Sequence, residues 1–337
     1  MIQPAGRVRM SLLIPLCIVI AAVAPAHAGL MITPTFCMDM TCGGAVPVAM
    51  QNAVNAATGT ITSLFTDPVN VSIFFRYATT EADGMTALPA NLLGRSNWGI
   101  SSITWNNYIN ALTADYAANP DPNRAIAQPN FPGAALSTNV RVSTANQRAI
   151  GINTAGFLKS DGTCCTGTFD GIITLNSNQT FAFSRGMLNG TNFDAQRTLE
   201  HEIDEVLGFG SFLDLGGTDI RPVDLFSYSS AGTRNRTTTG SRYFSIDGGA
   251  TNIVSFNQGG GDKGDWLSAA CPNQANPFVQ NANSCMGQFS DVALTSPEGT
   301  MLDVIGYDVV PEPASMLLVG AGLGLVLLAK RRVRIRG

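Results

Sequence analysis

Apolar residues in the first half of the chain recur first at helical spacing and then as strand-like runs. Residues 47–65 (PVAMQNAVNAATGTITSLF) have helical spacing up to an Asp-Pro pair, and VNVSIFFRY at 69–77 is a β-branched and aromatic run typical of a strand. Residues 84–100 mix Gly, Asn and Leu, which favours a loop. SITWNNYINALTADYA at 102–117 predicts a second helix, ended by NPDPN. The pattern therefore predicts an α+β domain.

The next elements lead up to one polar helix. Residues 141–155 supply strand material around Ala149–Ile152, and the alternation in 169–184 predicts an edge strand or hairpin. A helix is expected at about 192–207, with a capping box over Thr191–Asp194 and Gly208 as its left-handed terminator. The remainder, about 209–309, is rich in Gly, Ser and Asn, which predicts loops and short strands.

The N-terminal segment has the pattern of an export signal. Arg7 and Arg9 precede the apolar run LLIPLCIVIAAVA, and Ala26-His27-Ala28 has the small-residue spacing of a cleavage site. We therefore expect residues 1–28 to be a signal peptide that signal peptidase removes. The mature chain would begin at Gly29.

The C-terminal segment, residues 310–337, carries a second signal. A Pro-Glu-Pro triplet precedes 16 uncharged residues, 314–329, and five basic residues follow. Sixteen helical residues span roughly 24 Å, close to the hydrocarbon core, so 314–329 predicts a transmembrane segment. The basic residues after it would hold that end in the cytoplasm. The segment closely resembles a PEP-CTERM sorting signal, which implies an exopolysaccharide-making Gram-negative bacterium and removal of the tail by an exosortase. Cell-surface or matrix localisation would follow.

The charge of the remaining domain, residues 29–309, narrows its partners. It keeps 13 basic and 23 acidic residues, a net charge of −10. Such a charge disfavours nucleic acid or an anionic lipid surface as a partner, and it favours bound cations. The length of about 280 residues suits one large domain or two small ones.

Cysteine usage agrees with export. Six cysteines remain outside the signal peptide, and an even number in an exported chain predicts up to three disulfides. Cys37–Cys42 and Cys271–Cys285 are the natural local pairs, whereas Cys164-Cys165 could bridge each other or pair elsewhere. The sequence leaves that choice open.

The helix at 192–207 carries the candidate chemistry. It contains EHEIDEVLG, and His201 is the only histidine outside the signal peptide. At helical spacing His201 and Glu205 share the face opposite the apolar stripe at 199, 203, 206 and 207, with Glu202 beside them. Two ligands one turn apart with an adjacent carboxylate suit a metal site. The alternative is a solvated acidic face, which would crowd the four acids at positions 200, 202, 204 and 205.

The same stretch resembles a known metal helix. HEIDEVLGFGS is similar to the metzincin motif H-E-x-x-H-x-x-G-x-x-H at His201, Glu202 and Gly208. The later blocks RPVDLFSYSSAGTRN, YFSIDGGATNIVSFNQGGGDKGDW and MLDVIGYD resemble, in order, a family of PEP-CTERM-anchored metalloproteases. The resemblance covers roughly 45–310. It implies a zincin fold, a twisted mixed sheet with an active-site helix, and peptidase ancestry.

The resemblance also implies roles for the residues. His201 would be a metal ligand, Glu202 the general base, and Glu205 the second ligand in place of a histidine. The third ligand stays open among Ser211, Asp214, Asp219 and Asp224. Met301 is a candidate for a methionine floor beneath the metal, with a core methionine as the alternative. Zn²⁺ is the expected ion, and the extra carboxylate makes the site harder and open to Ca²⁺ or Mn²⁺.

Three other features bear on function. Asp262 and Asp265 in GGGDKGDW could hold Ca²⁺ or form a solvated turn, and Trp98, Trp105 and Trp266 could line a sugar-binding surface or fill the core. An edge strand in 172–184 could bind a peptide substrate as an added strand. The sequence thus predicts a surface-sorted zinc endopeptidase of low activity. The alternatives are a non-catalytic surface or exopolysaccharide-matrix protein and a Ca²⁺-stabilised adhesin.

Overall fold

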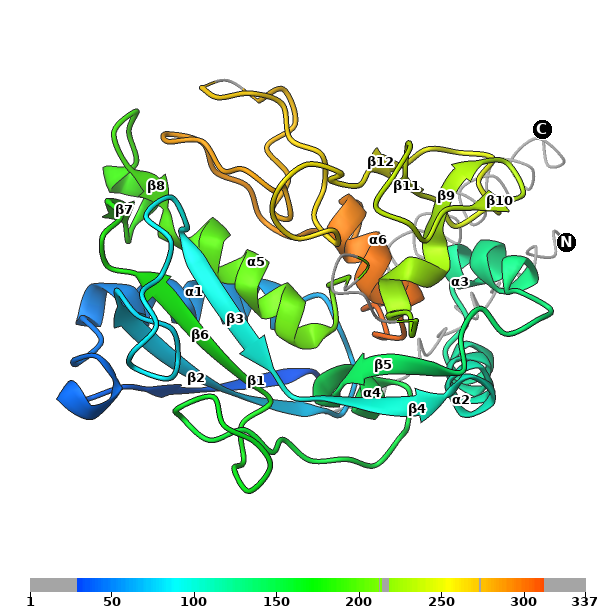
Figure 1. The fold of residues 1–337 in the computed structure, drawn as a ribbon, viewed down its shortest axis with the longest axis horizontal. Helices are drawn as coiled ribbons and strands as arrows, with labels where there is room; N and C mark the ends of the chain where they lie inside the picture. Colours follow the sequence, from blue (N-terminus) through cyan, green and yellow to red (C-terminus); the bar gives the residue numbers. More distant parts are fainter. Residues whose placement is uncertain (1–28, 212, 214–217, 273, 312–337) are drawn as a thin grey trace, which may run out of the picture.

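A mixed four-stranded sheet forms the base of the fold, in a computed structural model that describes residues 29–211, 213, 218–272 and 274–311. The strand order is β1 (Met31–Phe36), β2 (Asn70–Ala78), β6 (Gly171–Asn176) and β3 (Gly94–Trp98). The first three strands are parallel, and β3 pairs antiparallel with β6 at one edge. The domain is α+β, as its pattern predicts (Figure 1).

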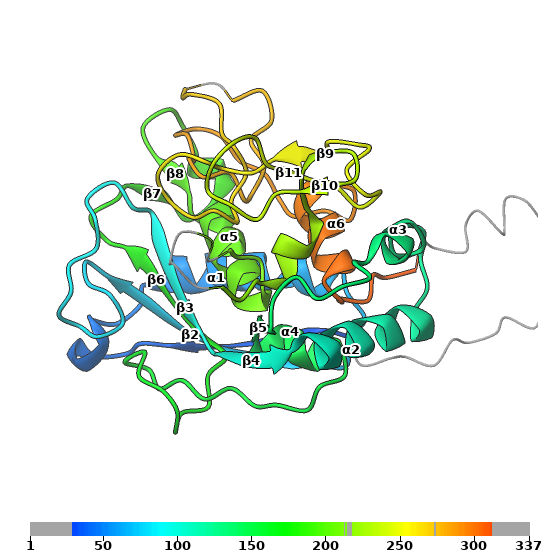
Figure 2. The ribbon, with the colours of Figure 1, turned by 45° about the vertical axis from the view of Figure 1, so that its right-hand side comes forward.

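Two helices pack on this sheet. α1 (Val48–Thr62) contacts β1 and lies beside α5 (Ala195–Leu207), which contacts β3 and β6. Figures 1 and 2 both show α5 between the sheet and the loop-rich C-terminal part. The helix therefore has one face against the sheet and another against the later chain.

The expected edge strand is wrong in position. All six residues of β6 are buried, because β2 pairs on one side of it and β3 on the other. The two edges of the sheet are β1 and β3, and β3 lies inside the segment 84–100 that the sequence predicts as a loop. GRSNW contains no β-branched residue, so it has no local strand signal, and pairing with β6 decides its conformation. Residues 181–182 form the separate short strand β7 (Phe181–Ala182), which pairs with β8 (Phe193–Asp194).

Two further predictions need correction. Strand β5 (Asn139–Ser143) ends before Ala149–Ile152. The Ser143 hydroxyl accepts a hydrogen bond from the Asn146 backbone N–H and so caps the start of helix α4 (Thr144–Ala149). α5 begins at Ala195 with Asp194 as its capping residue, so the capping box over Thr191–Asp194 is wrong. Gly208 does end the helix in the left-handed conformation, at φ 117°.

The other elements complete the domain. The helix predicted at 102–117 corresponds to α2 (Trp105–Ala118). Residues 102–104 belong instead to β4 (Ile100–Thr104), which pairs with β5. The C-terminal part is loop-rich with short strands, as predicted, and ends in α6 (Pro297–Val304). The remaining elements are α3 (Pro122–Ala127), β9 (Ser227–Ser230), β10 (Thr233–Arg234), β11 (Tyr243–Phe244), β12 (Val254–Ser255) and the 3₁₀ turns η1 (Met40–Cys42), η2 (Gln128–Asn130), η3 (Arg185–Met187) and η4 (Pro222–Phe226).

One hydrophobic core joins both halves. Its buried members run from Leu30 to Tyr307 and include Trp105, Trp266 and Met301. Two of the three tryptophans are thus core residues rather than part of a sugar-binding surface. Met301 lies in this core on α6; its assignment as a methionine floor stays a prediction.

Three disulfides are formed. Cys37–Cys42 and Cys271–Cys285 are the local pairs expected, and Cys164 bridges its neighbour Cys165. The structure thus settles the pairing that the sequence leaves open. Each bridge closes a short segment, so the disulfides stabilise loops rather than join distant parts of the domain.

Candidate metal centre

The polar side chains of α5 are buried, not solvated. Leu199, Ile203, Val206 and Leu207 fill the core as the predicted stripe. The four acids at positions 200, 202, 204 and 205 are also buried, each less than a tenth exposed. The solvated acidic face is therefore wrong, and the cost of burying these carboxylates calls for partners.

Two of these acids face away from the candidate centre. Glu200 accepts hydrogen bonds from the Gln196 amide and from the Val292 backbone N–H, at 2.9 and 2.8 Å. Asp204 is fully buried near Glu298, and burial raises its pKa well above the ordinary value. Glu200 thus joins α5 to the C-terminal part, whereas the Asp204 carboxylate oxygens accept no hydrogen bond from the described residues.

The centre itself combines His201, Glu205 and Asp265. One ligand atom of each lies within 4.8 Å of the others. His201 Nε2 is 3.8 Å from Glu205 Oε1 and 3.6 Å from Asp265 Oδ1. The sequence prediction that His201 and Glu205 share a face agrees with this geometry. Asp265, which the sequence places in a calcium-binding loop or a solvated turn, lies beside them as a third candidate ligand.

These distances suit a small divalent ion. Ligands about 2.0–2.1 Å from a tetrahedral zinc lie about 3.3–3.4 Å from one another, and the two distances from His201 Nε2 exceed this range by a few tenths of an ångström. The Glu205 and Asp265 ligand atoms lie within 4.8 Å of each other, so these carboxylates would move closer together around an ion. Calcium requires six to eight oxygen ligands, and this set offers one imidazole and two carboxylates. The donor set therefore fits zinc or a similar transition metal better than calcium.

A backbone carbonyl orients the imidazole of His201. His201 Nδ1 lies 3.1 Å from the carbonyl oxygen of Val279. A carbonyl only accepts, so this contact places a proton on Nδ1. Nε2 faces Glu205 and Asp265, and it is the ring nitrogen that would bind a metal ion.

Glu205 and Asp265 each have an orienting hydrogen bond. The Ser96 hydroxyl of β3 donates to Glu205 Oε2, and the Gln280 amide donates to Asp265 Oδ1 at 3.3 Å. Burial raises the pKa of both carboxyls well above the ordinary value, and neighbouring acids add to the rise. A cation between them would relieve this repulsion.

Glu202 lies beside the cluster, against β3. A Cβ on Gly94 would come within 2.5 Å of Glu202 Oε1, so the strand backbone approaches this carboxylate closely. Burial raises its pKa, while nearby His201 and Arg95 oppose the rise. A buried carboxyl of raised pKa next to a metal site suits a general base.

A cavity opens over these residues. Its volume is about 1010 Å³, large enough for a peptide segment or a compact ligand. Its lining includes residues 94–98 of β3, His201, Glu202 and Glu205 of α5, and residues 281–284. Trp98 thus lies in the cavity wall rather than in the core, with the Arg221 guanidinium 4.8 Å from its ring centre.

The third-ligand candidates named from sequence do not join the cluster where they are described. The Ser211 hydroxyl donates to Asp224 Oδ1 at 2.7 Å, and Asp224 also accepts from the Arg221 backbone N–H. Asp219 accepts from the Asn139 backbone N–H, on β5. Asp214 lies outside the described residues.

The residue found instead, Asp265, comes from the loop read as a calcium site or a solvated turn. It is buried, and Asp262 beside it accepts from the Gly264 backbone N–H. The solvated turn is therefore wrong for Asp265. The Gly-rich sequence GGGDKGDW is typical of a surface loop, which is why the sequence does not predict this burial. The one available signal was Trp266, an apolar anchor directly after the aspartate.

The sorting prediction has independent support. Residues 309–332 match the PEP-CTERM protein-sorting motif. This is an exported, surface-sorted protein. The motif also implies processing by an exosortase, as the sequence predicts. Comparisons with curated proteins and with solved structures give no match.

The structure does not test the predicted transmembrane segment. Residues 314–329 and the predicted signal peptide, 1–28, lie outside the described residues. Among the residues that are described, no helix is both long and apolar enough to cross a bilayer. The transmembrane segment stays a prediction.

Proposed function

We propose that this surface-sorted protein is a metal-dependent endopeptidase with a zincin-like catalytic domain. The observation that carries the proposal is the convergence of His201, Glu205 and Asp265 within 4.8 Å at the edge of a cavity. Zn²⁺ is the proposed ion, because one imidazole and two carboxylates fit its coordination better than that of calcium.

The surroundings of the cluster support a peptide as substrate. β3 is one edge of the sheet and lines the cavity, and within the part of the chain that the structure describes it pairs on one side only, with β6. An extended peptide could add to its free side by main-chain hydrogen bonds. In that position the peptide would lie along α5, beside Glu202 and the metal ligands.

Each residue of the site would have its own role in the reaction. A zinc ion in this set would supply Lewis acidity and make a water molecule more acidic. Glu202 would accept a proton from the attacking water and donate it to the leaving amine. Ser96 would hold Glu205, and the Val279 carbonyl would hold His201, so that neither ligand turns away. The second carboxylate adds negative charge, which predicts a weaker Lewis acid than a two-histidine site and low activity.

A non-catalytic surface or exopolysaccharide-matrix protein is the second candidate. The burial of Glu202 against the backbone of β3 favours it, because a base held there is less available to a water molecule. A Ca²⁺-stabilised adhesin is the third, and the net charge of −10 in residues 29–309 is its main support.

Metal analysis of the purified exported protein separates these candidates. The endopeptidase predicts about one zinc per chain, loss of that zinc in His201→Ala, and cleavage of an unstructured protein such as casein. Metal without cleavage would favour the matrix protein. Calcium alone, with no effect of His201→Ala, would favour the adhesin and end the peptidase proposal.

A further inference from the structure

The segment 278–284 forms the wall of the cavity that orients the candidate ligands. The Val279 carbonyl lies 3.1 Å from His201 Nδ1, and the Gln280 amide donates to Asp265 Oδ1 at 3.3 Å. Two consecutive residues thus contact two of the three proposed ligands. The segment contains no helix or longer strand, so other parts of the chain hold it in place. An isolated bridge between Asn281 and Trp266 and a hydrogen bond from the Gln280 backbone N–H to Glu298 connect it to the C-terminal part, and a contact from α5 must set its place relative to His201.

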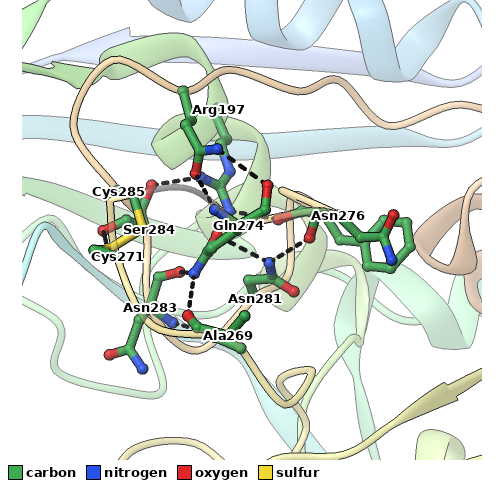
Figure 3. Close-up of a disulfide and its surroundings, with 12 residues drawn as sticks. Arg197, Ala269, Cys271, Gln274, Asn276, Asn281, Asn283, Ser284 and Cys285 are labelled. Carbon is green, nitrogen blue, oxygen red and sulfur yellow. Dashed lines mark hydrogen bonds between the residues drawn. A yellow bond between two sulfur atoms is a disulfide. The ribbon is translucent and has the colours of Figure 1, made fainter. Parts of the chain in front are cut away.

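Arg197 supplies contacts on both sides of Val279. It lies on α5 one helical turn before His201, and it is fully buried. Its two terminal nitrogens donate to the Phe278 carbonyl at 2.6 Å and to the Ser284 hydroxyl at 2.7 Å. Figure 3 shows Arg197 beside Ser284 and the Cys271–Cys285 disulfide. One rigid guanidinium therefore ties the segment to the helix that carries His201.

Two other groups close the same loop. The Cys271–Cys285 bridge joins its ends, and the Gln274 amide donates to the carbonyls of Ala269 and Asn283 (Figure 3). These contacts lie within the loop and cannot set its distance from α5. Arg197 can, because it belongs to the helix.

We propose that Arg197 is a positioning residue for His201: it fixes the 278–284 segment so that the Val279 carbonyl holds the imidazole with Nε2 turned towards Glu205 and Asp265. The effect of Arg197 on metal binding rests on the proposed function. The contacts of Arg197 and Val279 do not depend on it. A neutral imidazole carries one N–H, and the carbonyl that accepts it fixes both the tautomer and the plane of the ring.

A role in binding substrate is the competing explanation, since Arg197 lines the cavity. Its terminal nitrogens, however, already donate to the two protein oxygens on either side of Val279. A substrate carboxylate would have to displace them. The contacts therefore favour an orienting role.

The direct test reads the histidine ring in the metal-free protein. In the full chain with His27→Gln, His201 is the only histidine, so its two ring nitrogens give unambiguous ¹⁵N resonances. We expect the Nδ1-protonated tautomer to predominate in this background. In Arg197→Gln the ring should shift towards a mixture of tautomers, and Arg197→Lys, which cannot contact both oxygens at once, should lie between them.

Zinc titration gives the second readout. Loss of an outer contact to a metal-bound histidine lowers metal affinity about 10–100-fold, and we expect this range for Arg197→Gln. Arg148→Gln is the control, because Arg148 also donates to two backbone carbonyls, those of Asn70 and Thr154, and to Asp170, but does not line the cavity. It should leave the tautomer and the affinity unchanged.

The outcomes separate the two proposals. A folded Arg197→Gln protein with an unchanged tautomer and unchanged zinc affinity would overturn the positioning role. If Arg197→Gln does not fold, Ser284→Ala removes one of the two contacts and should shift the tautomer in the same direction; no shift there would also overturn it. If the parent protein binds no zinc, the proposed function fails, while the tautomer measurement still decides the role of Arg197.

Discussion

His201 Nε2 lies 3.6 Å from Asp265 Oδ1, across the boundary between α5 and the loop-rich C-terminal part. This contact makes Asp265 the third candidate ligand, so Asp265→Asn should lower zinc affinity by an order of magnitude or more while the fold persists. Asp219→Asn is the matched control, because Asp219 is a ligand candidate by sequence but accepts a hydrogen bond from Asn139 of β5 instead. Equal zinc affinity in Asp265→Asn and the parent protein, measured by titration, would remove Asp265 from the site.

Glu202 should be separable from the ligands. Glu202→Gln keeps the shape of the side chain but cannot accept a proton, so we expect about one zinc per chain to remain and cleavage to fall at least about 100-fold. Glu200→Gln tests a buried acid of the same helix that faces Val292, and it should leave cleavage of an unstructured protein within a few-fold of the parent. Full activity in Glu202→Gln would exclude it as the base.

The close approach of β3 to Glu202 gives a steric test. Gly94→Ala would bring a methyl group to within 2.5–2.9 Å of the Glu202 carboxylate and so displace it from the cavity wall. Cleavage should fall while zinc content stays the same. Gly133→Ala adds the same methyl group where no atom lies within 4 Å, and it should behave like the parent in both assays.

Metal removal should destabilise the protein. A ligand at 100 times its dissociation constant stabilises the folded state by about 2.7 kcal/mol, and here it would also relieve repulsion between Glu205 and Asp265. Dialysis against a chelator should therefore lower the unfolding midpoint, and added zinc should restore it. An identical midpoint in both states, with His201→Ala also identical, would argue against a bound ion.

A second acidic pair predicts how stability depends on pH. Burial, and then Asp308, raises the pKa of Asp67 from 3.8 to about 8, and its Oδ2 accepts the Asp308 backbone N–H. Because the folded state holds this proton more tightly than the unfolded chain, the stabilisation is complete below about pH 4. It is lost as pH rises through 8, with a slope of at most about 1.4 kcal/mol per pH unit.

Chemical denaturation between pH 5 and 9 would measure this slope. Asp67→Asn keeps an acceptor for the Asp308 N–H but cannot titrate, so its stability should change less over that range. A steeper loss in Asp67→Asn than in the parent would contradict the raised pKa. Asp219→Asn, at a carboxylate outside this pair, is again a suitable control.

The local parts of the molecule were predictable because they depend on neighbouring residues. Helical spacing alone predicted that His201 and Glu205 share a face, and Gly208 predicted the end of α5. The sorting motif is likewise a contiguous pattern, so the sequence alone identified export to the surface. Short-range disulfides followed from cysteine spacing for the same reason.

The rest depended on contacts between distant segments. GRSNW became an edge strand only because β6 offers it a partner, and Asp265 became a candidate ligand only because Trp266 anchors its loop in the core, against Phe209 just after α5. No spacing rule links such residues, since their proximity is set by how the core packs. The sequence therefore determined the histidine, its neighbouring acids and the destination of the protein. Tertiary packing decided the third carboxylate, the cavity wall and the orientation of the imidazole.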